Sequence, residues 1–568
     1  MKKKMKRITA VVAPVLAMSV ALTACSGAGD KKASTEPKNG DKQPEGKLAA
    51  KQVLNLVEAN EIPSMDVSKS TDTVSSLILG NTMEGLYRLD KDNKPIPGIA
   101  ESYKKSDDGK KYTFKLRKDA KWSNGDPVTA KDFVFAWQRL LNPKTAAEYA
   151  FIMYDIKNAK AINESKAAVD SLGAKAVDDY TLEVELDNPV PYFLGLTAFT
   201  SFLPLNEKVV KEHGDKYGLE ADKMVYNGPF KMKEWKHEQG WKLQKNDQYW
   251  DKATVKLDEI NWSVVKEQST RVNLYESGQL DRVNLTSEYV DKFKANKDEF
   301  GTLLEPSTFF IRLNQKRNGQ DTVFKNKKAR QAIALAFDKK ALANVILNDG
   351  SKPVDALIPE KFAVGPGEKD YRETFKSTGI KTDVKKAKQL WDEAKKELGK
   401  EEVTVEFLNY DDDNAKKVGE YLKEQFEKNL PGLKISIKLQ PFKQKLKLET
   451  AQDYDLTYAG WNPDYADPMT FLDMFQTGNP QNEMSYSNAK YDEIIKKSQG
   501  EWLTDQKKRW EEMAKAEKIL LEDETALVPM YQRGRSFLQR PTVHNIYKHN
   551  VGSQFSYKWA YITEKEGK

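Results

Sequence analysis

The stretch KWSNGDPVTAKDFVFAWQRLLNP (residues 121–143) holds a turn, a helix start and a helix stop in succession. Asn124-Gly125-Asp126-Pro127 predicts the turn. Thr129 is then placed as an N-cap, with Asp132 three residues later as the acidic partner of a capping box. Apolar side chains recur at helical spacing over 133–141, and an Asn-Pro pair ends the run. The stretch predicts a short amphipathic helix that follows a turn.

Alternating strands flank this helix on both sides. KKYTFKLR (110–117) places Tyr112, Phe114 and Leu116 on one face, and TLEVELDNPVPYFLGL (181–196) alternates before a proline-rich exit. This period of two is typical of half-buried strands. Further strands are predicted at 52–58, 227–251, 259–265, 307–315 and 454–461, and helices at about 72–87 and 504–523.

The segment 383–439 indicates the architecture most directly. It alternates a helix near 384–398, a strand at 403–410, a helix near 413–428 and a strand at 433–440. Strands joined by helical crossovers predict parallel pairing, so the segment predicts an α/β lobe.

Composition and charge limit the class of protein. The chain has 568 residues, of which 39% are hydrophobic and 10% aromatic, enough for several cores. The formal net charge is +7, and Lys, Arg, Asp and Glu are mixed along the body. Nucleic-acid binding would require a clustered basic face, so we expect no nucleic-acid partner.

The amino-terminal region contains the only cysteine of the chain, Cys25. Lys and Arg residues at 2–7 precede an apolar run at 8–21, which is typical of a signal peptide and too short for a permanent membrane span. Residues 26–48 are small, polar and charged, which predicts a flexible tether. A lone cysteine excludes internal disulfides.

Motifs for common chemistries are missing from the sequence. It has neither a phosphate-binding G-x-x-x-x-G-K-[ST] loop nor a G-x-S-x-G nucleophile elbow. His237-Glu238 begins like a zinc-protease helix, but Trp241 stands where the second histidine is needed. We therefore expect no enzyme activity, no metal and no cofactor.

The segment GWNPDYADPMTFLDMF (460–475) is the strongest candidate site. Asp464 lies between the aromatic residues Trp461 and Tyr465, just after a predicted strand. Ligands of α/β sheets bind in loops beyond the carboxyl ends of strands. A carboxylate shielded by rings is costly unless it meets a cation. The other interpretation is an ordinary Asp-Pro turn beside two core aromatics.

These stretches together carry a family resemblance. MEGLYRLD, PIPGIAESY, KYTFKLRKDAKWSNGDPVTAKDFVFAWQRLLNP, VYNGPFKMKEW and AGWNPDYADPMTFL resemble the oligopeptide-binding proteins of ABC importers (family 5 of the extracytoplasmic solute-binding proteins) over about residues 52–565. The resemblance implies an α/β fold of the periplasmic-binding-protein type II class with an extra domain, in which two mixed-sheet lobes close on a hinge. The domains expected are a signal peptide (1–24), a lipidated cysteine and tether (25–48), lobe I (49–87, 206–315 and 532–568), lobe II (88–205) and lobe III (316–531).

The same resemblance implies roles for individual residues. Asp464 falls on the acid that binds the α-ammonium group of a peptide, and Trp461 on a residue that lines a side-chain pocket. Tyr149 and Tyr531 match aromatic residues of the cleft. Phe442 stands where relatives carry a second pocket tryptophan, and Tyr458 replaces an arginine that engages the peptide carboxylate. Gly460 and Asn462, on either side of Trp461, complete the predicted peptide site.

The expected function is capture of oligopeptides and their delivery to the permease of an ABC importer whose ATPase subunits are separate chains. Leu22-Thr23-Ala24-Cys25 resembles a lipobox, which implies that Cys25 carries lipid and anchors a monomer on the outer face of the cell membrane of a Gram-positive bacterium. The alternatives are a receptor of the same fold for a signalling peptide, or for a nickel chelate, haem or oligosaccharide. A lipid-anchored hydrolase with an unrecognised site is a third class.

Overall fold

A computed structural model describes residues 46–376 and 379–565. The leader, Cys25 and most of the predicted tether lie outside these residues, so the signal peptide and lipid site stay predictions. Among the described residues, no helix has both the length and the apolar character that crossing a bilayer requires.

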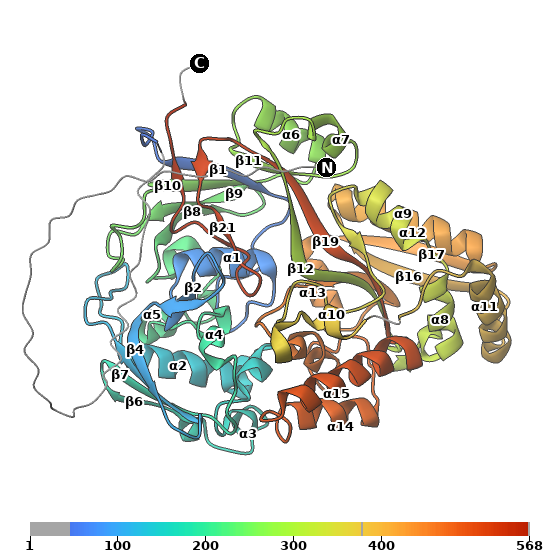
Figure 1. The fold of residues 1–568 in the computed structure, drawn as a ribbon, viewed down its shortest axis with the longest axis horizontal. Coiled ribbons are helices and arrows are strands. Elements are labelled where there is room, and N and C mark those ends of the chain that lie inside the picture. Colours follow the sequence, from blue (N-terminus) through green and yellow to red (C-terminus); the bar gives the residue numbers. More distant parts are fainter. Residues whose placement is uncertain (1–45, 377–378, 566–568) are drawn as a thin grey trace, which may run out of the picture. The chain divides into compact units, whose positions relative to one another are not determined.

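A seven-stranded mixed sheet contains the strand that precedes the candidate loop (Figure 1). Its order is β11 (Arg282–Leu285), β19 (Leu527–Gln539), β12 (Phe300–Leu313), β18 (Leu456–Trp461), β16 (Val403–Tyr410) and β17 (Leu433–Gln440), and β15 (Lys352–Pro353) pairs with β19. Strand β12 runs antiparallel to both β18 and β19.

The predicted α/β unit of this sheet is confirmed. Strands β16 and β17 are parallel along their full lengths. Helix α11 (Val384–Leu398) precedes β16, and α12 (Asp413–Asn429) connects β16 to β17. Helix α13 (Phe442–Thr450) then leads from β17 into β18, which is parallel to β16. The apolar faces of α11 and α12 bury Trp391, Leu422 and Phe426 against the strands.

Two four-stranded sheets are built from the earlier part of the chain. One has the order β1 (Val53–Glu58), β10 (Glu259–Val264), β9 (Gly240–Lys245) and β8 (Phe230–Lys236). The other has the order β4 (Ala100–Lys105), β5 (Lys111–Leu116), β7 (Thr181–Glu185) and β6 (Ala174–Asp178). Six of these strands agree with the predicted patterns, and β4 and β6 were not predicted. The division of the chain into three lobes at the expected boundaries stays a prediction.

The stretch 121–143 folds as predicted. Helix α2 spans Ala130–Leu141, and the Asp132 carboxylate accepts a hydrogen bond of 2.7 Å from the backbone N–H of Thr129. Trp137 is fully buried on the inner face of the helix, and its indole N–H donates to the carbonyl of Phe202 at 3.0 Å.

One helix ends earlier than its pattern predicts, and another changes from α- to π-helical hydrogen bonding before it reaches the predicted end. Helix α1 covers Thr73–Thr82, not 72–87, because the chain becomes extended at Met83 and continues into β2 (Tyr87–Leu89), which pairs with β3 (Pro95–Pro97). Gly85 makes this course possible, since a Cβ there would lie 2.3 Å from the carbonyl oxygen of Thr197. Helix α15 covers Gln506–Lys518, and a π-helical turn, Ile519–Asp523, follows it.

The other helices are short connections between these elements. They are α3 (Ala159–Asn163), α4 (Phe193–Leu196), α5 (Glu207–His213), α6 (Gln268–Glu276), α7 (Glu288–Phe293), α8 (Lys327–Leu335), α9 (Lys339–Ala341), α10 (Tyr371–Thr374) and α14 (Ala489–Ser498). Two-residue strands pair as β13–β14 (Lys316–Arg317 with Gln320–Asp321), β20–β23 (Val543–His544 with Tyr561–Ile562) and β21–β22 (Tyr547–Lys548 with Phe555–Ser556).

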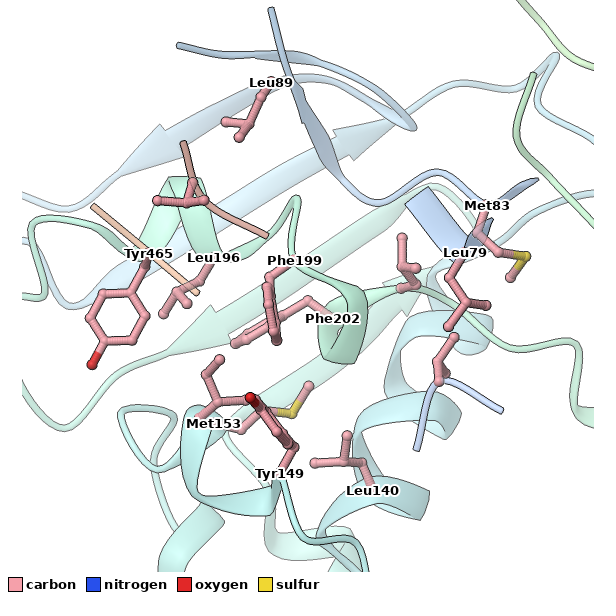
Figure 2. Close-up of a cluster of buried hydrophobic side chains, with 14 of the residues drawn as sticks. Leu79, Met83, Leu89, Leu140, Tyr149, Met153, Leu196, Phe199, Phe202 and Tyr465 are labelled. Atoms are coloured by element: carbon pink, nitrogen blue, oxygen red, sulfur yellow. The ribbon is translucent and has the colours of Figure 1, made fainter. Parts of the chain in front are cut away.

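One apolar cluster joins segments that are far apart in sequence. Figure 2 shows Leu79 and Met83 at α1, Leu140 from α2, and the rings of Tyr149, Phe199 and Phe202 on one side of them. Tyr465, from the loop that follows β18, belongs to the same buried cluster. The candidate loop is therefore packed against the part of the chain that contains the stretch 121–143.

Replacing Trp137 by Phe should lower the free energy of unfolding by about 1–3 kcal/mol, because the buried carbonyl of Phe202 loses its donor. Urea unfolding followed by circular dichroism measures the change. Trp559→Phe is the control, because that side chain is only partly buried. Equal losses in the two variants would contradict the assignment of this hydrogen bond.

Candidate functional site

A cavity of about 310 Å³ lies where the sheets meet the candidate loop. Its walls come from the end of β1, from β12, β18 and β19, and from α12 and α13. All eight residues that the sequence predicted for the peptide site line it: Tyr149, Phe442, Tyr458, Gly460, Trp461, Asn462, Asp464 and Tyr531. The structure thus brings the set together, while the role of each residue stays a prediction.

Strand β18 presents an open edge to this cavity. On one side it pairs with β12 along its whole length, from Leu456 to Trp461. On the other side, β16 pairs only with Leu456 and Thr457, so no described strand pairs with that edge from Tyr458 onward. A side chain at Gly460 would not fit, since a Cβ there would lie 2.7 Å from the ring of Phe309. The end of β18 therefore offers main-chain hydrogen-bonding groups without a protein strand to receive them.

Asp464 is a buried carboxylic acid without a cationic partner. Its side chain is 8% exposed, and no Lys, Arg or His among the described residues forms an ion pair with it. The loop is held in place because the backbone N–H of Asp464 donates to the hydroxyl of Thr470 at 3.0 Å. Burial and the nearby Asp473 raise the pKa of Asp464 well above its usual value, while a hydrogen bond with Tyr149 lowers it.

The same loop contains an acid that does have a cation. Asp467, three residues later, forms a bidentate pair with the fully buried Arg509, at 2.7 and 2.8 Å. Asp473 accepts from the hydroxyl of Tyr465 at 2.9 Å, and burial raises its pKa to about 7. The fold supplies a structural cation for Asp467 and leaves Asp464 facing the cavity.

Aromatic rings line the cavity beside Asp464. The rings of Tyr149 and Trp461 are nearly parallel, with centroids 6.2 Å apart, and Phe199 stacks with Tyr149 at 6.0 Å. The indole nitrogen of Trp461 is buried and has no hydrogen-bond partner among the described residues. These rings shield Asp464 from water, which accounts for the effect of burial on its pKa.

A second aromatic group lines the cavity beside β12. The rings of Phe309 and Tyr531 are parallel at 5.1 Å, and the hydroxyls of Tyr458 and Tyr531 are hydrogen-bonded to each other. Phe442 packs at 5.7 Å from Tyr410, which the sequence analysis did not identify.

Sequence reasoning also missed a buried charge network that forms part of the cavity wall. Lys445 and Glu449 of α13 are paired at 2.7 Å, and both are almost fully buried. Arg312 of β12 lies 3.7 Å from Glu449 and pairs with Glu483, whose pKa is raised to about 7 by burial. The spacing of Lys445 and Glu449, four residues apart on one helix, was the available signal, but such pairs are usually solvent-exposed.

Comparison with known proteins assigns the chain to a family. The model of the bacterial extracellular solute-binding proteins, family 5, matches residues 94–483. The chain belongs to this family. Members of family 5 are substrate-binding proteins, and the described fold has the mixed α/β sheets of solved peptide-binding members.

Individual relatives match the family 5 chain nearly end to end. The dipeptide-binding protein DppE of Bacillus subtilis is 36% identical over 96% of this chain and 97% of its own length. The substrate-binding domain of a Bacillus anthracis oligopeptide ABC transporter is 69% identical, with a TM-score of 0.90, and covers 91% of this chain and 100% of its own. Listeria monocytogenes OppA, solved with bound peptide, is 47% identical with a TM-score of 0.87 and the same coverage.

Replacing Lys445 by Met should destabilise this family 5 chain by about 3–5 kcal/mol. Glu449 would lose its nearest cation in a buried place, and the carbonyl of Tyr458 would lose its donor at 2.7 Å. Chemical unfolding provides the measurement. Lys443→Met, an exposed position on the same helix, should change stability by less than about 0.5 kcal/mol. A Lys445→Met variant as stable as that control would contradict a structural role for the pair.

Proposed function

We propose that this chain captures oligopeptides in the cavity and delivers them to an ABC importer. The observation that carries the proposal is Asp464, a buried carboxylic acid with no protein cation, at the wall of a cavity. The family membership and the peptide-bound relative support the same ligand class. Relatives of this chain are a dipeptide-binding protein, an oligopeptide-binding protein and the substrate-binding domain of an oligopeptide ABC transporter.

The chemistry of Asp464 selects a cation with hydrogen-bond donors. Inside a protein, an ionised carboxylate without a counter-ion is costly, so its pKa rises until a cation arrives. The α-ammonium group of a peptide supplies a positive charge and three donors, and a charge-assisted hydrogen bond is about twice as strong as a neutral one. Haem, sugars and nickel chelates do not carry this group, so Asp464 favours peptides over those ligands.

The open edge of β18 provides recognition that does not depend on peptide sequence. An extended peptide that pairs with the backbone beyond Tyr458, whose carbonyl already accepts from Lys445, would add one strand to the sheet. Main-chain pairing gives affinity without reading side chains. Asp464 then sets the register, because it fixes where the peptide begins. Trp461, Phe442 and Tyr149 line the space left for peptide side chains.

The proposal includes how the chain is held near the importer. As a member of an extracellular family, it works outside the cytoplasm. Lipid on Cys25 would anchor a monomer to the outer face of a Gram-positive cell membrane, with residues 26–48 as a tether. Hinge closure of the lobes around a peptide would give the form that docks on the permease, while ATP is hydrolysed by separate subunits. A signalling peptide as the ligand fits the same site chemistry.

Asp464→Asn should weaken binding of peptides with a free amino terminus by about tenfold or more, because the neutral amide cannot pair with the ammonium charge. Isothermal titration with a free-amine peptide and its N-acetylated form measures the effect. Asp119→Asn, at an exposed position, is the control. If Asp464→Asn and Asp119→Asn bind free-amine peptides equally well, the proposed role of Asp464 is wrong.

Affinity for free-amine peptides should also rise with pH. The raised pKa of Asp464 keeps the empty site protonated at low pH, and binding of an ammonium requires the ionised form. The affinity should therefore grow as pH rises through that pKa, and should fall again only when the amine loses its proton near pH ~8. Titration from pH 5 to about 8 tests this expectation. The Asp464→Asn variant should lose the rise of affinity with pH. If the variant keeps that rise, a group other than Asp464 causes it.

A further inference from the structure

Two guanidinium groups share one buried carboxylate at the wall formed by β19. Arg535 binds Glu305 through two hydrogen bonds, of 2.6 and 3.2 Å. The Nε atom of Arg533 lies 3.6 Å from the same carboxylate, too far for a hydrogen bond. Glu305 is 1% exposed, and although burial raises its pKa, Arg535 and Arg533 lower it to about 2. The carboxylate is therefore ionised and already neutralised by Arg535, which leaves the positive charge of Arg533 in excess.

Arg533 is a partly exposed cation at the cavity. The residue lines the cavity wall, and 34% of its side chain is exposed. Its charged end lies 5.4 Å from the centre of the Phe309 ring, in a cation–π contact that orients it. Within the described part of the chain, its side-chain donors make no hydrogen bond, whereas the guanidinium of Arg535, two residues later on β19, binds Glu305 through two. Its five N–H groups remain available for a ligand.

Apart from Glu305, two further acids lie near Arg533 without forming an ion pair with it. Glu58 and Asp349 also line the cavity, and burial raises the pKa of each. Neither forms an ion pair with Arg533 within 4 Å. Burial thus disfavours the ionised forms of these acids, and Asp349 is engaged with the backbone N–H of Ser351 at 3.0 Å.

We propose that Arg533 binds a carboxylate of the captured peptide. The inference rests on the proposed function and names the group that holds the acidic part of the ligand. A planar guanidinium with free donors matches a carboxylate in a two-bond geometry that a lysine cannot provide. That carboxylate is either the carboxyl terminus of the peptide or an acidic side chain, since both present the same group to Arg533.

Arg533 and Asp464 give the cavity two complementary sites. Asp464 is an acid without a protein cation, and Arg533 is a cation whose neighbouring carboxylate is already bound by another residue. A peptide is the ligand class that carries an ammonium and a carboxylate on one extended chain. The two sites together would favour peptides over amines or acids alone.

The test compares the Arg533→Gln and Arg533→Lys variants with the parent chain. Isothermal titration uses three probes with free amino termini: Ala-Ala-Ala-Ala as the free acid, the same peptide amidated at its carboxyl terminus, and amidated Ala-Ala-Glu-Ala. Lys352→Gln is the matched control, because it removes one positive charge from β15, next to β19, without lining the cavity. Thermal unfolding checks that each variant folds.

Arg533→Gln should weaken the free acid about tenfold or more while leaving the tetra-alanine amide unchanged, if the carboxyl terminus is the partner. If Arg533→Gln weakens binding of the Glu-containing amide alone, the partner of Arg533 is an acidic side chain of the peptide. Arg533→Lys should recover part of the loss. Equal affinities of Arg533→Gln and Lys352→Gln for all three probes would overturn the inference. If the parent chain binds none of the probes or any other peptide, the proposed function itself fails.

Discussion

The buried carboxyl group of Asp464 is the constraint on which the cavity depends. The side chain is 8% exposed beside aromatic rings, and the described residues offer it no cation. An ionised acid that is buried without a counter-ion costs several kcal/mol, on the order of the desolvation penalty of one ion. The chain supplies Asp467, on the same loop, with Arg509, so the fold is able to pair an acid there. We propose that leaving Asp464 without such a partner reserves its place for a cation that comes with the ligand.

Strand β18 and the apolar cluster around Tyr149 hold the loop that contains Asp464. Strand β18 is paired with β12 on one side and is free beyond Thr457 on the other, so it is an interior strand at its start and an edge at its end. Tyr149, which lines the cavity with Asp464 and stacks on Trp461, is fixed by the cluster that joins α1, α2 and the loop after β18 (Figure 2). The site is thus made by segments more than three hundred residues apart.

Much of this fold could be predicted from local patterns. The alternation of α11, β16, α12 and β17, and the capping box of α2, follow from spacings of two, three and four residues. The early end of α1 could not be predicted, because it depends on the approach of a distant carbonyl to Gly85. The eight site residues came from a resemblance, and the structure places them on one cavity. The network of Arg312, Glu449, Glu483 and Lys445 was missed because its burial is set by tertiary packing, and a single sequence shows charges without showing their exposure.

The identity of the ligand that the chain carries from the cell tests the central claim most directly. Native mass spectrometry of residues 26–568, purified without added peptide and then denatured to release what is bound, provides the measurement. The account predicts a set of short peptides with free amino termini. One defined peptide would keep the site chemistry and indicate a signalling ligand. Release of a metal chelate, haem or an oligosaccharide would contradict the account and leave Asp464 as an ordinary turn residue.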